Sequence, residues 1–214
     1  CSTRPDAISP DIVERLGEAG FACVELGIQS FSDKALLMSQ RGYDGETARR
    51  ACAMLAGMQA RTGVSLGIQL LPGMPGLEPG EALADIKQSI VFRPSCVRLY
   101  PCLVLEGTGL AKMWKEGAYR PWDFGPTVDF LTDACRSFDN EVIAVIRMGL
   151  AEEPGLDSHV LAGPRHPSLG GMVRSRVLFS FVREKIESLD KDRAQSHSRK
   201  PGLHTGGGEG MVLY

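Results

Sequence analysis

SCVRLYPCLVLEGTGL, residues 95–110, is the stretch of sequence that decides the fold. It follows Pro94, runs as a nearly continuous series of β-forming residues through Tyr100, and breaks at residues 106–109, where Thr108 can cap a helix. The succession of strand, polar loop and helix start is where α/β sheets place their ligands. Glycines flank Thr108, so the backbone can approach a ligand closely there. An ordinary strand-to-helix connection explains this segment alone equally well.

The same succession recurs upstream. Continuous apolar runs typical of buried strands alternate with helical patterns at intervals of about thirty to forty residues. Strands are expected at 21–31, at 64–71 and from residue 95, and helices at 10–19, 44–63 and 79–91. This alternation predicts right-handed βαβ units and a parallel sheet. The predicted fold class is α/β.

After Gly117 the pattern changes. A helix at 126–138, a strand at 142–150 and a long helix at 168–189 predict a small C-terminal α/β extension over residues 123–189. The buried side of the long helix is expected to be Leu169, Met172, Val173, Val177, Phe181 and Ile186. From Asp190 onward the apolar periodicity ends, so residues 190–214 are expected to form a mobile tail.

Composition and charge exclude some classes of protein. The formal net charge is −2 and the pI is near 6.1, so no global basic field favours nucleic acid. Between Arg174 and Lys200, however, eight basic residues stand against four acidic ones, which suits either an RNA-facing patch or a solvated helix face. No apolar run reaches the ~18 residues of a membrane span and no signal peptide is visible, so no membrane partner is expected.

The cysteines and the start of the chain bear on its context. The six cysteines lie mostly inside apolar patterns, which indicates reduced thiols in a cytoplasmic protein. The chain begins at Cys1, already inside a strand-like segment, so an N-terminal part is expected to be missing.

Five motifs follow one another along the chain. They are STRPDAIS (2–9), VELGIQSF (24–31), QRGY (40–43), LLPGMPG (70–76) and VRLYPCLVLEGTGL (97–110), the last followed by MWKEGAYRPW (113–122). In order and spacing they resemble the radical S-adenosylmethionine (SAM) domain of the Elongator catalytic subunit and its bacterial relatives. VIRMGL (145–150) and AGPRHPSLG (162–170) resemble the C-terminal extension of the bacterial branch. The resemblance implies that residues 1–122 form the C-terminal portion of a partial (β/α) TIM-like barrel of the radical SAM type. Oxygen-independent coproporphyrinogen III oxidase shares this barrel and a looser version of these motifs.

The resemblance implies an enzyme with SAM and a [4Fe-4S] cluster held by three cysteines spaced as CxxxCxxC or similarly. One electron, from a donor such as flavodoxin or ferredoxin, then cleaves SAM to a 5′-deoxyadenosyl radical. In Elongator the substrate is the wobble uridine of tRNA, so RNA is the implied partner. No two of the six cysteines are two or three residues apart, so the cluster ligands are expected upstream of this chain, which receives no metal ligand.

The resemblance also implies residues that bind SAM. Gln29 matches a residue that contacts SAM in the coproporphyrinogen oxidase relatives, and Arg41 matches an arginine on the carboxylate side of SAM. Gln69 stands where those relatives have an aspartate, and Ser2 where many have a glutamate, which leaves the ribose contacts open. The full set of predicted cofactor-binding residues is Arg4, Gln29, Ser30, Arg41, Gln69 and Tyr100. Each has a structural alternative, such as a strand-end amide that satisfies loop backbone.

Four further residues are predicted to line the substrate site: Arg98, Cys102, Arg147 and His166. Arg98 and Cys102 alternate with apolar neighbours, so they can point into the barrel. A buried ion pair is the alternative for Arg98 and Arg147, and a loop-stabilising imidazole is the alternative for His166. No catalytic residue and no oligomeric state is assigned.

Three functions remain open from the sequence. The first is part of a radical SAM enzyme that modifies RNA, and the second is a coproporphyrinogen-oxidase-like radical SAM protein acting on a small molecule. The third is a barrel without catalysis that binds RNA or a partner. All three place Gln29, Gln69 and the turn at 100–108 along one edge of the sheet.

Overall fold

The computed structural model describes residues 1–150 and 155–198. The chain divides into two compact units, Cys1–Val177 and Leu178–Tyr214, and all the strands of the described chain belong to the first unit. Among the described residues, no helix combines the length and the apolar character needed to cross a membrane. The predicted boundary between residues 122 and 123 stays a prediction.

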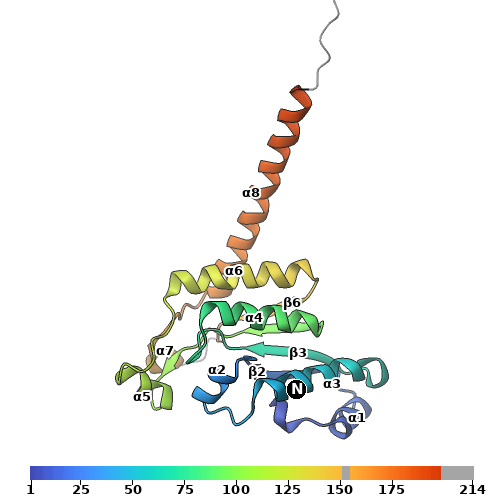
Figure 1. Cartoon of the computed structure of the whole chain (residues 1–214), viewed down its shortest axis with the longest axis vertical. Helices are drawn as coiled ribbons and strands as arrows, with labels where there is room; N and C mark the ends of the chain where they lie inside the picture. The colour runs from blue at the N-terminus through green and yellow to red at the C-terminus, as the bar shows by residue number, and fades with distance from the viewer. Residues whose placement is uncertain (151–154, 199–214) are drawn as a thin grey trace, which may run out of the picture. The chain divides into compact units, whose positions relative to one another are not determined.

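Five parallel strands form the main sheet of the described chain, in the order β1-β2-β3-β4-β6 (Figure 1). They are β1 (Ser2–Thr3), β2 (Cys23–Gln29), β3 (Ser65–Leu70), β4 (Cys96–Leu99) and β6 (Ala144–Met148). The connections between neighbouring strands contain helices, as parallel pairing requires. The predicted parallel sheet is therefore confirmed, and the carboxyl ends of its strands share one edge.

Helices occupy the connections between strands. They are the 3-10 helix η1 (Pro5–Ala7), α1 (Pro10–Glu18), α2 (Asp33–Met38), α3 (Gly45–Thr62), α4 (Pro79–Val91), α5 (Gly109–Lys115) and α6 (Phe124–Asn140). Ser9, Asp44 and Thr108 each accept a hydrogen bond from an N–H of the first turn, as their cap positions predict. The sequence pattern did not predict α2, because six residues with two buried side chains give too short a periodic signal.

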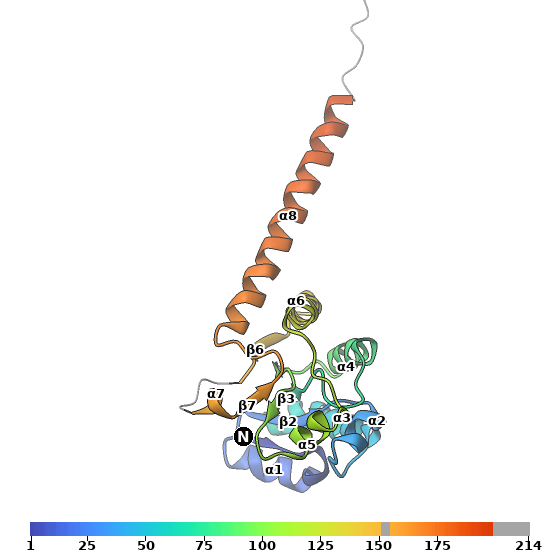
Figure 2. The ribbon, with the colours of Figure 1, turned by 90° about the vertical axis from the view of Figure 1, so that its left-hand side faces the viewer.

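One face of the sheet carries the apolar core. Its side chains are at most 1% exposed and include Leu26, Ile28, Leu66, Ile68, Val97 and Leu99. Figure 2 shows α1, α3, α4 and α6 in an arc on one side of the strands. Because side chains alternate along a strand, the residues between these apolar ones point to the opposite face, which we call the inner face.

The stretch at 95–110 is not one continuous strand. β4 ends at Leu99, and Pro101, which has no N–H to donate to a ladder, follows almost at once. Beyond it, β5 (Val104–Leu105) pairs antiparallel with β7 (Val160–Ala162) in a separate two-stranded sheet of the described chain. β7 follows the short helix α7 (Leu156–His159), and neither element was predicted.

The last helix, α8 (Leu169–Ser198), corrects two expectations. It continues beyond residue 189 into the predicted tail, whose remainder at 199–214 lies outside the described residues. Its predicted buried side also holds only at the start, because Leu169 and Val173 are buried whereas Phe181 and Ile186 are more than half exposed.

Candidate functional site

The inner face of the sheet is polar where the other face is apolar. Strand register places Ser2 beside Glu25, Glu25 beside Gly67, and Gln69 beside Arg98. A hydroxyl, a carboxylate, an amide and a guanidinium on four neighbouring strands therefore point to the same side. Glu25, Gln69 and Arg98 are each partly exposed on this face.

An ion pair between Glu25 and Arg98 lies at the centre of the inner face. The Arg98 guanidinium donates from Nη2 to Glu25 Oε1 at 2.8 Å and from Nε to Oε2 at 2.5 Å, which is the two-point geometry of strong arginine–carboxylate pairs. The Arg98 side chain is 27% exposed and the Glu25 side chain 14%, so water screens the pair only in part. The buried ion pair given as the alternative for Arg98 is thus present, in partly buried form.

Gly67 makes this pair possible. It lies on β3, between the strands that carry Glu25 and Arg98. A Cβ at Gly67 would lie 2.7 Å from Glu25 Cγ, closer than real Cβ contacts allow. Because Gly67 has no side chain, the Glu25 side chain can cross over β3 and reach the guanidinium on β4.

Further polar groups extend the network from the ion pair. Gln69 Nε2 donates to Glu25 Oε2 at 3.1 Å and to Ser2 Oγ at 3.2 Å, and Arg98 Nη1 donates to the Tyr100 hydroxyl at 3.4 Å. Burial alone would raise the pKa of Glu25, but the hydrogen bonds that it accepts from Arg98 and Gln69 outweigh burial and lower the pKa below its ordinary value. Glu25 is therefore a carboxylate at neutral pH.

Gln29 joins the same face through a strained turn. Its φ is 63°, in the left-handed region, and Ser30 N donates to Ile28 O at 2.7 Å across it. A Cβ on Gly27 would lie 2.9 Å from Gln29 Nε2 and 3.7 Å from Gln69 Oε1, so both amides lie close to Gly27. Strain of this kind, at the carboxyl end of a strand, is common at ligand sites.

Ser30 does not point to the inner face. It is fully buried, and its hydroxyl donates to Asp85 of α4 at 2.6 Å. Asp85 also accepts from Phe31 N at 2.8 Å, and burial raises the pKa of Asp85 to about 6. The structure thus gives Ser30 a positioning role: it ties the Gln29 turn to helix α4 on the outer side of the sheet.

Arg4 and Arg41 lie together beside Tyr43. Arg4 pairs with Asp6 at 2.8 Å, donates to the Arg41 carbonyl oxygen at 2.6 Å, and lies with its guanidinium carbon 5.3 Å from the centre of the Tyr43 ring. The Tyr43 hydroxyl donates to Gly27 O at 2.9 Å, which connects this group to β2. Arg41 Nε is buried and has no hydrogen-bond partner among the described residues, so its N–H is an unsatisfied donor.

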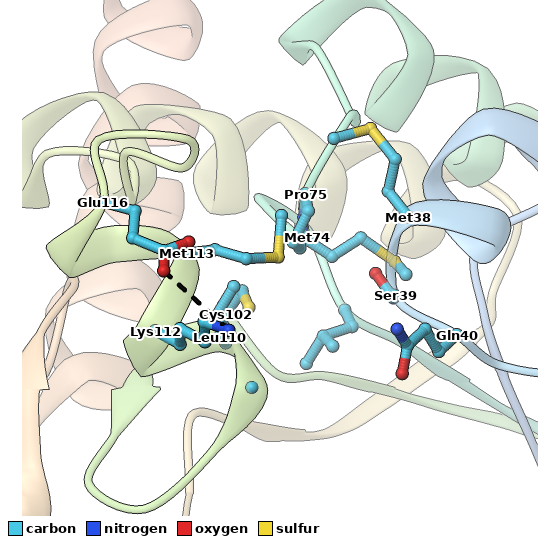
Figure 3. A pocket seen from close by; sticks show the side chains of 12 residues that line it. Met38, Ser39, Gln40, Met74, Pro75, Cys102, Leu110, Lys112, Met113 and Glu116 are labelled. Atoms are coloured by element: carbon cyan, nitrogen blue, oxygen red, sulfur yellow. Dashed lines mark ion pairs between the residues drawn. The ribbon is translucent and has the colours of Figure 1, made fainter.

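A pocket of about 520 Å³ opens where the loops leave the carboxyl ends of β2, β3 and β4. Figure 3 shows Met38, Met74 and Met113 lining it, with Ser39 and Gln40 on one side and α5 on the other. Ser39 Oγ is buried and has no hydrogen-bond partner among the described residues. On the α5 side the pocket is lined by the charged residues Lys112 and Glu116, whose Nζ and Oε1 atoms are 3.9 Å apart. Sequence reasoning missed this pocket, because methionines in short helices and in a loop look like ordinary core residues.

The predicted substrate residues do not all meet. Arg98 is on the inner face, whereas Cys102 is buried, lines the pocket, and has the pKa of its thiol raised to about 11 by burial. Arg147 is exposed, and no hydrogen bond or ion pair holds its side chain in the described part of the chain. His166 accepts from Ser168 N at 3.0 Å just before α8 and packs on the Phe124 ring, as a loop-stabilising imidazole does.

Glu25 is the functional candidate that sequence reasoning left out. A charged residue inside a continuous apolar strand was the signal that could have found it. Among the residues whose side chains the structure describes, no group of three His, Cys, Asp or Glu could hold a metal ion. All six cysteines are among these residues and are free thiols.

The chain is similar to radical SAM proteins. Residues 94–178 match the Radical_SAM C-terminal domain. A solved coproporphyrinogen III oxidase from Escherichia coli, described as a radical SAM enzyme, covers 65% of this chain and 31% of its own at a TM-score of 0.52 and 16% identity, which supports the fold alone. The predicted partial (β/α) barrel of the radical SAM type is thereby confirmed.

The more specific likeness is to Elongator-type proteins. A tRNA uridine(34) acetyltransferase from Methanocaldococcus jannaschii is 32% identical over 135 residues, which make up 62% of this chain and 24% of the relative. The structure of Methanocaldococcus infernus Elp3 covers 84% of this chain and 41% of its own at a TM-score of 0.69 and 26% identity. The predicted resemblance to Elongator-like radical SAM proteins is confirmed, and the chain spans about a quarter of the length of the relatives it matches.

Proposed function

We propose that this chain forms part of a radical SAM enzyme that modifies RNA, with the wobble uridine of tRNA as the substrate class. The observation that carries the proposal is the polar network on the inner face, where Glu25, Gln69 and Arg98 converge from three strands. The names of the relatives, which include a tRNA uridine(34) acetyltransferase, support RNA as the substrate.

The inner face fits the polar groups of SAM. SAM presents an ammonium, a carboxylate and ribose hydroxyls, and these require both acceptors and donors. Glu25 supplies a carboxylate, Arg98 a guanidinium, and Gln29 and Gln69 supply amides that donate and accept. We assign the ribose and amine contacts to Gln69 and Glu25, and a carboxylate contact to Arg41, whose Nε is free of any described hydrogen bond.

The chain does not fit the iron–sulfur cluster. Clusters of this kind need closely spaced thiolates, and the described residues hold no such group. The proposal therefore requires cluster cysteines from polypeptide outside this sequence. When bound to such a cluster, SAM supplies a 5′-deoxyadenosyl radical on receipt of one electron, for which a flavodoxin or ferredoxin is the proposed donor.

The residues of this chain position the reactants. The pair of Glu25 and Arg98 holds the inner face in one arrangement, because each side chain fixes the rotamer of the other through two hydrogen bonds. The pocket of about 520 Å³ lined by Met38, Met74 and Met113, with charged side chains on α5, offers a recess that can take a substrate base.

The first test is the sequence encoded upstream of Cys1. A CxxxCxxC-type triplet on a strand-to-helix loop within about a hundred residues supports the proposal. The protein that includes this segment, reconstituted anaerobically with iron and sulfide, should form 5′-deoxyadenosine from SAM. Gln69→Ala and Arg98→Ala should weaken SAM binding by about tenfold, equivalent to ~1.4 kcal/mol.

Arg120→Ala is the matched control, because Arg120 is an exposed arginine whose one ion pair within the described residues is with exposed Asp123. Unchanged SAM affinity in both inner-face variants would contradict the assigned site. Binding of tRNA that weakens steeply with salt should accompany SAM cleavage if RNA is the substrate. Absence of a cysteine triplet, with salt-dependent RNA binding retained, would favour the barrel that only binds RNA.

A small-molecule radical SAM enzyme is the second candidate. The fold shared with coproporphyrinogen III oxidase is consistent with it. SAM cleavage without measurable tRNA binding would favour this candidate over RNA modification.

A further inference from the structure

The second unit of the chain exposes a set of large apolar side chains on one helix. Within Leu178–Ser198 of α8, six such residues are between 45% and 65% exposed: Leu178, Phe179, Phe181, Val182, Ile186 and Leu189. Scattered exposed apolar residues are normal on a protein surface, but a contiguous group of this size marks an interaction site.

Four of these residues are spaced as in a coiled coil. Phe179, Val182, Ile186 and Leu189 follow one another at steps of three, four and three, which are the a, d, a and d positions of two heptads. We call these four residues the seam. A helix surface with this spacing is complementary to a second helix of the same kind, since each residue packs into a hole between four residues of its partner.

Charges beside the seam fit a second copy of the same helix. Lys185 occupies a g position and Asp190 the next e position. In a parallel pair the g residue of one helix faces the following e residue of the other, so Lys185 faces Asp190 of the second copy on both sides. Neither residue forms an ion pair within the described part of the chain, so both are available for this contact.

We propose that two copies of this chain associate through a parallel pairing of their α8 seams. The second copy is favoured as occupant because the seam and its flanking charges are self-complementary. Two heptads are short for a coiled coil, so the association is reversible and depends on protein concentration.

Sedimentation equilibrium of the purified chain over a range of concentrations tests the proposal. The wild type should reach a dimer, and Ile186→Glu/Leu189→Glu should weaken self-association at least about tenfold, because charges replace apolar seam residues. Glutamate has a high helix propensity, so α8 should persist, which far-ultraviolet circular dichroism checks. Val91→Glu, which replaces an exposed valine of α4, is the matched control and should associate like the wild type.

Charge exchange tests the orientation. Lys185→Glu should weaken the dimer, and Lys185→Glu/Asp190→Lys should restore it. The proposal is overturned by a wild type that stays monomeric or by a dimer that the seam variant does not weaken. It is also overturned if Lys185→Glu/Asp192→Lys restores the dimer and the Asp190 exchange does not, because that result indicates antiparallel pairing.

Discussion

Glu25 and Arg98 form their ion pair across an intervening strand, β3, and not between adjacent strands. The side chain of Glu25 passes over Gly67 on β3, where a Cβ would lie 2.7 Å from Glu25 Cγ. The arrangement of the inner face therefore depends on the Glu25–Arg98 ion pair and on the lack of a side chain at Gly67.

Gly67→Ala should break this arrangement. The added Cβ would overlap Glu25 Cγ, so the carboxylate must leave Arg98 or β3 must shift, and we expect the free energy of unfolding to fall by about 1–3 kcal/mol. Urea denaturation measures the change. Gly57→Ala is the matched control, because a Cβ at Gly57 of α3 meets no atom within 4 Å, and it should raise stability by about 0.5–1 kcal/mol. Equal effects at both glycines would contradict the crossing.

Arg98→Ala should destabilise the protein in a pH-dependent way. Because the pKa of Glu25 is lowered in the folded state, its ion pair adds stability above the unfolded pKa, near 4.3, and this stability is lost as pH falls through the folded pKa. We expect a loss of about 1–3 kcal/mol at pH 7 that shrinks in acid. Denaturant titrations at several pH values check this, and Arg120→Ala should change stability by less than about 0.5 kcal/mol. A pH-independent loss would argue against the carboxylate as the partner.

Asp85→Asn should remove a pH dependence of the opposite sign. Burial raises the folded pKa of Asp85 to about 6, whereas the unfolded value is near 3.9, so the wild type loses stability relative to the variant as pH rises from about 4 to 6. Between pH 4.5 and 7 the free energy of unfolding of the wild type should fall by about 2 kcal/mol relative to that of the variant. Urea titrations at pH 4.5 and 7 measure it; parallel pH profiles in the two proteins would show that Asp85 does not titrate in this range.

Val142→Gly should stabilise the protein. Val142 follows α6 with a φ of 59°, a left-handed conformation that costs a β-branched residue ~1–2 kcal/mol, and its side chain is 94% exposed, so its removal costs little packing. We expect a net gain of about 0.5–1 kcal/mol in thermal or urea unfolding. Val91→Gly, in the last turn of α4, should instead destabilise. A loss of stability in both variants would refute the strain at residue 142.

The sheet and its helices can be predicted from local sequence signals, whereas the candidate site can be predicted only in part. Continuous apolar runs and cap residues such as Asp44 and Gly63 predict β2, α3 and β3 in their correct order, because both signals act within a few residues. The break after Leu99 was missed, since Val104 finds its partner in Ala162, far along the chain.

The site residues show the same limit. Gln29 and Gln69 were predicted to share an edge, and in the structure both of their amides lie close to Gly27, while their role in binding SAM stays a prediction. The sequence analysis did not select Glu25, because its partner Arg98 lies two strands away in the sheet. The two side chains reach each other because Gly67, on the strand between them, has no side chain. Ser30 was predicted to bind cofactor but faces Asp85, because the left-handed turn at Gln29 redirects the chain.

The pairing of β5 with β7 has a consequence for how the chain folds. β2, β3 and β4 can dock in sequence as each crossover helix forms, since successive strands along the chain are neighbours in the sheet. Val104 instead pairs with Ala162, and α5, α6 and β6 lie between them in the sequence. Closing so long a loop is entropically costly and slow, so this small ribbon is expected to form last, and it would be the first tertiary contact to be lost when the chain is stressed.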